Sequence, residues 1–201
     1  YFYINGRPYD NSQDVASDAF NQYMSGGFTG LIMYEIREKR SMAYSAYGVN
    51  ATPELPGKDC YFIGYVGTQS DKVNDAISVY MDILSDMPKD STQLVALKAA
   101  LKQAAQTAKP SMRGKAATFE AWQRLGYKDD PAKVNAAAID ALTFNDIEKF
   151  YEDNIKGKPV TIILMGDPKK IDVKAIEKKL GCKVTKLSPA KLFNSTQELM
   201  D

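Results

Sequence analysis

Arg37 and Tyr44 are two hydrogen-bond donors whose side-chain types could carry chemistry, and they lie seven residues apart. A guanidinium presents a planar fork of N–H donors that stays charged, and a phenol adds one further donor. Such donors can hold the carbonyl oxygens of an extended peptide and stabilise an oxyanion formed during its hydrolysis. Taken by type and spacing alone, Arg37 fits better as a solvated helix-end cation paired with Glu38, and Tyr44 as a half-buried strand aromatic.

A glycine-rich turn, with Gly26, Gly27 and Gly30, precedes these residues. A turn of this kind before a helix can cradle phosphate. This one lacks the Gly-Lys-Ser/Thr ending of a phosphate-binding loop, and it follows a predicted helix where such a loop would follow a strand. We therefore expect a tight turn between two helices, with glycine supplying a positive φ.

The chain contains no histidine. Two thiolates alone make a poor zinc site, so we predict no metal site in this chain. Cys60 and Cys182 are expected to be buried free thiols, with a disulfide as the alternative. Glu35 and Glu38 are expected on a solvated helix face rather than as an acid–base pair.

The elements that position these residues follow from hydrophobic periodicity and turn signals. Helices are predicted from residue 11 to 24, over 31–40, 73–87, 94–108, 115–125 and 131–141, from residue 143 to 156, and over 171–180. Strands are predicted over residues 1–4, 43–50, 61–68, 159–165 and 183–187, with 159–165 as the central strand. Residues 188–201 are predicted to form a surface tail, and Trp122 is expected to be a packing residue. Segregated helices and largely antiparallel pairing predict an α+β fold in one domain, residues 1–201.

Composition excludes several function classes. The 201 residues carry 26 basic and 25 acidic side chains, a net charge of +1, which gives no electrostatic footprint for nucleic acid. The longest apolar run, residues 160–165, is far too short for a membrane span.

Residues 25–47 resemble the pitrilysin-type (M16, inverzincin) zinc metallopeptidases, and specifically their non-catalytic domains. The best match is residues 35–44, Glu-Ile-Arg-Glu-Lys-Arg-Ser-Met-Ala-Tyr. In that family an arginine at the Arg37 position and a tyrosine at the Tyr44 position reach the substrate backbone near the scissile bond. The resemblance implies a two-layer α/β sandwich, with helices packed on one face of a mostly antiparallel sheet. It also implies that the loop of Gly26, Gly27 and Gly30 faces a substrate chamber.

The family's zinc motif is His-x-x-Glu-His, and a chain without histidine cannot supply it. The resemblance therefore implies an inactive-type, C-terminal-type domain that is a fragment of a longer chain and holds substrate. Zinc and the general base would come from a catalytic domain, in the same or another chain, and the substrate would be a peptide. One alternative is a structural or assembly domain of the same fold, as in the respiratory-complex core subunits that resemble these peptidases. Another is a generic peptide-binding module. Family habit suggests a periplasmic or organellar setting.

Overall fold

The computed structural model describes residues 1–55 and 57–188, which fall into two compact units, Tyr1–Met165 and a second one that begins at Gly166. The second unit contains α9 (Val173–Leu180). The Asp172 side chain caps the start of this helix, and Gly181 ends it in the left-handed region, with φ of 63°. The first unit holds the sheet and every candidate site residue.

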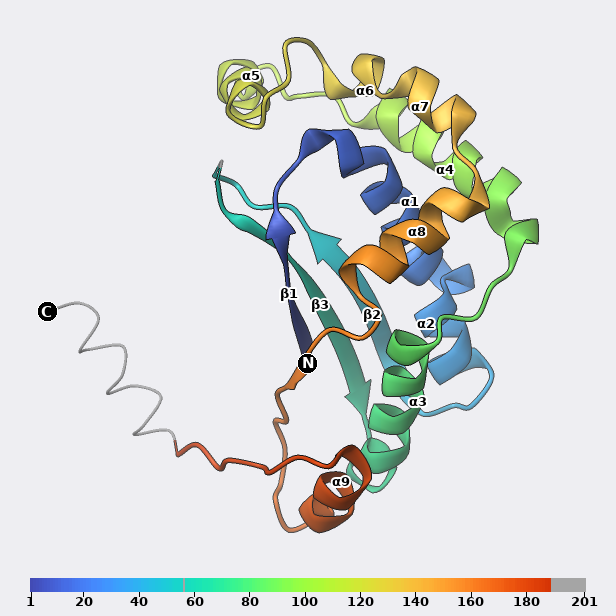
Figure 1. Ribbon diagram of the computed structural model, residues 1–201, viewed down its shortest axis with the longest axis vertical. Coiled ribbons are helices and arrows are strands. Elements are labelled where there is room, and N and C mark those ends of the chain that lie inside the picture. Colours follow the sequence, from blue (N-terminus) through green and yellow to red (C-terminus); the bar gives the residue numbers. More distant parts are fainter. Residues whose placement is uncertain (56, 189–201) are drawn as a thin grey trace, which may run out of the picture. The chain divides into compact units, whose positions relative to one another are not determined.

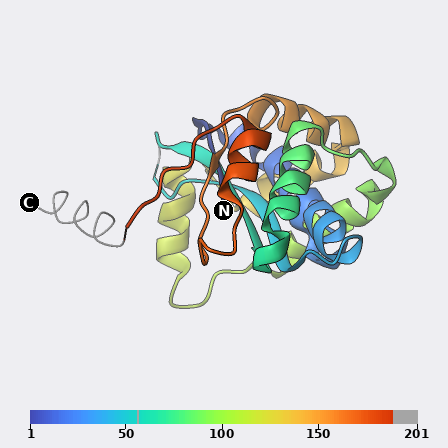
Figure 2. The same ribbon diagram turned by 90° about the horizontal axis from the view of Figure 1, so that it is seen from below.

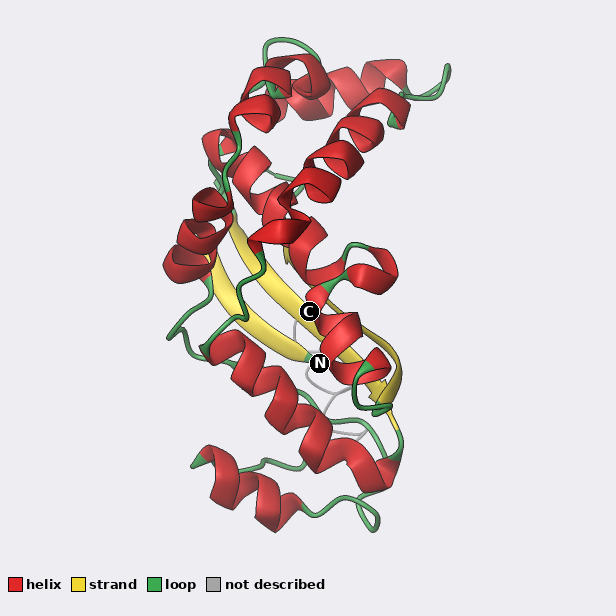
Figure 3. Cartoon of the chain, turned by 90° about the vertical axis from the view of Figure 1, so that its right-hand side faces the viewer, coloured by secondary structure: helices red, strands yellow, loops and turns green. Residues whose placement is uncertain are grey.

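The sheet of the first unit has four described strands: β1 (Phe2–Pro8), β2 (Ala43–Ala51), β3 (Asp59–Thr68) and β4 (Thr161–Ile162). Their order is β2-β3-β1-β4, and every neighbouring pair is antiparallel. The longer strands form one curved layer (Figure 3), and α1 and α3 lie on the same side of them in two perpendicular views (Figure 1, Figure 2). The predicted α+β fold is confirmed.

The described helices of the first unit are α1 (Asp14–Ser25), α2 (Leu31–Met33), α3 (Val73–Ser85), α4 (Leu94–Thr107), α5 (Lys115–Arg124), α6 (Pro131–Val134), α7 (Ala136–Ala141) and α8 (Phe144–Asn154). Three of them, α1, α3 and α8, are amphipathic and bury a row of apolar side chains. Among the described residues, no helix is both long and apolar enough to cross a bilayer.

Tyr80 of α3 anchors the core between helix and sheet. Its ring is fully buried and stacks on Phe2 with a centroid distance of 3.9 Å, and its hydroxyl donates to the Tyr47 carbonyl at 2.8 Å. The ring fits against β2 and β3 because Gly48 and Gly64, which have no side chain, lie beside it. A Cβ on Gly64 would lie 2.1 Å from the Tyr80 hydroxyl oxygen, and one on Gly48 would lie 2.5 Å from it.

Two of the predicted strands are wrong, one in its length and position and the other in its secondary structure. Residues 159–165 were expected to form the central strand, but only Thr161–Ile162 is a strand, and it lies at the sheet edge beside β1. Ile163 and Met165 are exposed. The prediction failed because an apolar run does not distinguish a central strand from an edge strand. Residues 183–187 have no regular secondary structure. The predicted tail lies outside the described residues except for Ser188.

Three other expectations also need correction. The helix predicted over residues 31–40 is α2 followed by a π-helical turn, Tyr34–Glu38. The helix predicted over residues 131–141 is divided into α6 and α7 at Asn135. Both cysteines are free, as predicted, but Cys60 is only half-buried and Cys182 is exposed, since Cys182 follows the end of α9.

Candidate functional site

Arg37 projects from a helical turn that is wider than an α-helix. The Lys39 N–H donates to the Tyr34 carbonyl at 2.9 Å, a π-type bond of the kind often found at functional sites. Ser41 then adopts a positive φ of 50°, and its N–H closes on the Arg37 carbonyl at 2.8 Å. A serine in this region stores about 1 kcal/mol or more of strain. The resulting chain reversal starts β2 and brings Tyr44 back beside Arg37.

Arg37, Tyr44 and Phe28 form one exposed group, which we call the aromatic–arginine cluster. The Arg37 guanidinium carbon lies 5.5 Å from the centroid of the Phe28 ring and 5.4 Å from that of the Tyr44 ring. Each contact at an exposed site contributes about 0.5–1 kcal/mol. Arg37 also pairs with Glu38 at 3.4 Å, as the helix-end interpretation expected. Tyr44 is 85% exposed, which contradicts the half-buried interpretation.

Phe28 is the member of the cluster that sequence reasoning missed. It is 70% exposed at the tip of the glycine turn, inside a short 3₁₀ segment, Gly27–Thr29. The available signal was a large apolar residue among three glycines. A turn of this composition has no buried face, so the pattern predicts that the Phe28 side chain is exposed.

The glycine turn has the tight geometry that the sequence predicted. Gly27 has a positive φ of 64°, and a Cβ on Gly30 would lie 2.7 Å from the backbone nitrogen of Gly26. The Ser25 hydroxyl fastens the turn to β2, donating to the Gly48 carbonyl at 2.8 Å and accepting from the Gly48 N–H at 2.7 Å. The turn is thus held to β2 three residues before Phe28.

Glu35 serves the helix end rather than acid–base chemistry. It accepts from Lys39 at 3.1 Å and from Arg40. Burial raises the pKa of the Glu35 carboxyl, but the hydrogen bonds from Arg40 and Lys39 outweigh burial and hold the pKa below its ordinary value. A carboxylate so paired is a poor proton carrier near neutral pH.

A zinc ion does not fit the residues of this chain. The sequence has no histidine, and within the described ranges no three His, Cys, Asp or Glu side chains gather in a group able to hold a metal.

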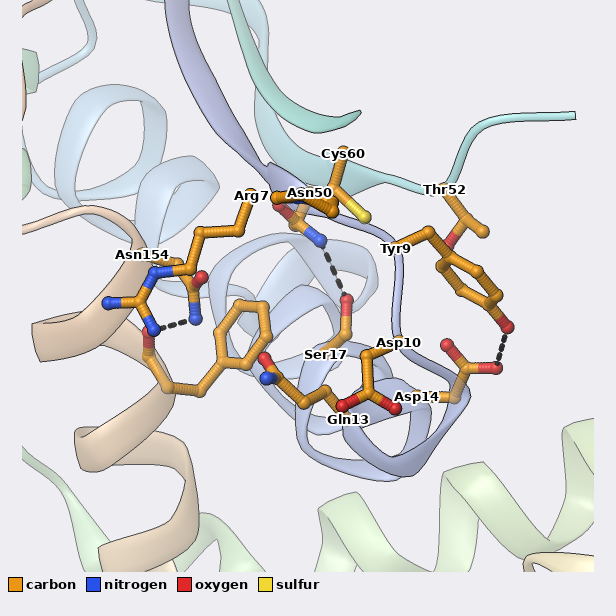
Figure 4. Close-up of a pocket in the computed structure, with 12 residues that line it drawn as sticks. Arg7, Tyr9, Asp10, Gln13, Asp14, Ser17, Asn50, Thr52, Cys60 and Asn154 are labelled. Atoms are coloured by element: carbon orange, nitrogen blue, oxygen red, sulfur yellow. Dashed lines mark hydrogen bonds between the residues drawn. The ribbon is translucent and has the colours of Figure 1, made fainter. Parts of the chain in front are cut away.

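A second polar cluster surrounds Asp14 at the start of α1 (Figure 4). Asp14 accepts from the Tyr9 hydroxyl at 2.6 Å and from the Tyr127 hydroxyl. Burial raises the pKa of the nearby Cys60 thiol, and the charge of Asp14 raises it further, so this thiol is a weak nucleophile. The cavity beside these groups measures about 20 Å³, room for about one water molecule. This cluster ties β1, α1 and the loop before α6 together.

No protein-family model matches the chain, and no curated protein matches it. Its fold does match solved structures. The peptidase M16 inactive domain from Pseudomonas fluorescens is 18% identical with a TM-score of 0.56, the match covering 79% of this chain and 38% of that one. A protease from Helicobacter pylori is 14% identical with a TM-score of 0.58, covering 76% of this chain and 37% of that one.

A chain of complex III2 from Candida albicans is similar to the same degree, at 13% identity and a TM-score of 0.58, covering 80% of this chain and 40% of that one. This chain thus spans well under half the length of these three proteins. At such identities the likeness establishes the fold alone. It confirms the fold that the resemblance of residues 25–47 implied, that of an M16 inactive domain.

Proposed function

We propose that residues 1–201 act as one non-catalytic, substrate-holding domain of a pitrilysin-type zinc peptidase. A catalytic domain carrying His-x-x-Glu-His, in the same or another chain, would supply the zinc and the general base. The two domains together would enclose a chamber for peptide substrates. The observation that carries this proposal is the aromatic–arginine cluster, which gathers Arg37 and Tyr44 on the surface of an M16-like fold.

The geometry of the cluster suits a peptide-binding role. The Phe28 and Tyr44 rings engage the guanidinium of Arg37 as cation–π partners. Hydrogen bonds from a guanidinium lie in its plane, so ring contacts of this kind leave in-plane N–H donors for a peptide carbonyl. The Tyr44 hydroxyl makes no hydrogen bond within the described residues and remains available as a second donor. In a closed, dry chamber, losing one such donor would lower kcat about 10²–10³-fold.

The glycine turn extends this role. Gly26, Gly27 and Gly30 present Phe28 at an exposed tip, and we place this tip at the chamber wall, where an aromatic ring can contact an apolar substrate side chain. The turn is fastened at Ser25, which allows the tip to keep its position relative to Arg37.

A structural or assembly role is the second candidate. It is favoured by the likeness to a chain of complex III2 from Candida albicans. In that case Arg37 and Tyr44 would contribute only to the helix end and the strand start.

Reconstitution separates the two roles. The chain would be mixed with the His-x-x-Glu-His domain encoded in its own or a neighbouring reading frame, and hydrolysis of a fluorogenic peptide would be measured at known zinc content. The proposal predicts that the zinc-loaded domain cleaves the peptide only when this chain is present. Cleavage by the isolated chain with stoichiometric zinc, or no effect of adding the chain, would contradict it.

A further inference from the structure

A larger concave surface, which we call the α1–α4 cavity, shares no residue with the aromatic–arginine cluster. Its volume is about 490 Å³, within the range of roughly 300–1,000 Å³ typical of small-molecule sites. It is lined by residues of α1, α4, α5, α6 and α7, and α4 and α7 run side by side in Figure 1. Most of its lining is apolar and comes from six elements, each of which contributes one of Val15, Val49, Leu101, Trp122, Ala132 and Ile139.

Most polar groups in the wall are already engaged. The Asn21 amide donates to the Asn50 carbonyl at 2.9 Å and accepts from the Asn50 N–H at 2.6 Å. The Asp130 carboxylate caps α6 by accepting from the Ala132 N–H at 2.9 Å. Asp18 differs, because its carboxylate has no hydrogen bond or ion pair within the described residues.

Within the described part of the chain, the charged side chains that line the cavity are all negative. Asp18 and Asp130 line it, and no lysine or arginine does so among the described residues. The Asp18 side chain is open to solvent within the concavity, yet the surrounding protein still hinders its hydration. Burial raises the pKa of the Asp18 carboxyl to about 6, with the charge of Asp14 adding to the effect. A carboxylate that has no partner and lies among apolar walls favours a cationic ligand.

Trp122 adds a feature that favours the same kind of ligand. Its half-buried indole lines the cavity. An indole ring attracts cations through its face and offers a large apolar area.

We propose that the α1–α4 cavity binds a small organic amine, an apolar ring or chain that carries one ammonium group. The ammonium pairs with Asp18, and the apolar part contacts Leu101, Trp122 and Ile139. This binding site is independent of the peptide-holding role proposed for Arg37.

The test uses the single tryptophan of the chain as its reporter. The full chain is titrated near pH 7.5 with 4-phenylbutylamine, with the neutral 4-phenylbutan-1-ol and with the anionic 4-phenylbutyrate, while Trp122 fluorescence is recorded and calorimetry measures binding directly. The amine is expected to bind saturably and about fivefold more tightly than the alcohol, the scale of a partly exposed ion pair. The carboxylate is expected to bind most weakly.

The Asp18→Asn variant removes the charge and keeps the shape, so it should abolish the preference for the amine over the alcohol. Asp82→Asn, at an exposed position of α3 that does not line the cavity, is the matched control and should keep the preference. Equal binding of amine and alcohol by the wild type, an unchanged preference in Asp18→Asn, or no saturable binding by calorimetry would each overturn the proposal.

Discussion

Replacing Asp18 with asparagine should stabilise the protein above pH 6 and leave it nearly unchanged near pH 4. Burial and the charge of Asp14 raise the pKa of the folded-state carboxyl from 3.8 to about 6. The folded protein therefore holds a proton that the unfolded chain loses, so the stability of the wild type falls as pH rises from about 4 to about 6. Asparagine cannot ionise and does not suffer this loss.

The size of the effect follows from the shift. About two pK units correspond to about 3 kcal/mol if the whole difference acted on folding. Asp18 is open to solvent, so screening reduces the expected gain to about 1 kcal/mol at neutral pH.

Urea unfolding at several pH values between about 4 and 8 would measure the difference between Asp18→Asn and the wild type. The difference should grow through the interval from 4 to 6 and then level off. Asp82→Asn, the control, should show no such step. A difference that stays constant across this interval would refute the reasoning that the folded protein raises the pKa of the Asp18 carboxyl.

Three further variants test the local geometry, each by urea unfolding. Gly64→Ala would place a Cβ 2.1 Å from the Tyr80 hydroxyl oxygen, and this overpacking should cost about 1–3 kcal/mol; a neutral result would mean that the ring has room to move. The Cβ of Gly27→Ala meets no neighbouring atom, but alanine must adopt a φ of 64°, so the free energy of unfolding should fall by about 1 kcal/mol. Gly27→Asn should lower it by less, and equal losses for the two variants would argue against backbone strain. Asp146→Ala removes the two hydrogen bonds that the Asp146 carboxylate accepts from the N–H and the hydroxyl of Thr143 at the start of α8. It should lower the free energy of unfolding by about 1 kcal/mol, whereas an unchanged midpoint would show that these bonds are dispensable.

Local signals in the sequence predicted the chain reversal between Arg37 and Tyr44. A helix that ends near residue 40 and a strand that starts near residue 43 leave only a short reversal between Arg37 and Tyr44. The contact of Arg37 with Phe28 is different, since it depends on how α1 and the glycine turn pack against β2. That packing is determined by tertiary structure, and residue spacing does not predict it.

Non-local pairing also explains the misplaced strand. The run at residues 160–165 has the composition of a buried strand, but its position depends on which edge of the sheet remained free after β1 paired with β3. The α1–α4 cavity was not predicted from the sequence for the same reason. Its lining comes from six elements spread between Val15 and Ile139, and Trp122 was expected to be an ordinary packing residue.

The central claim is that Arg37 holds substrate near the zinc of a partner domain. The most direct measurement is kcat/KM for peptide cleavage by the reconstituted assembly, comparing wild type, Arg37→Ala and Arg113→Ala at matched zinc content and fold. Arg113 is an exposed arginine outside the cluster and serves as the control. The account predicts a loss of about 10²-fold or more for Arg37→Ala alone. Equal activity of the two variants would contradict it and leave Arg37 an ordinary helix-end cation.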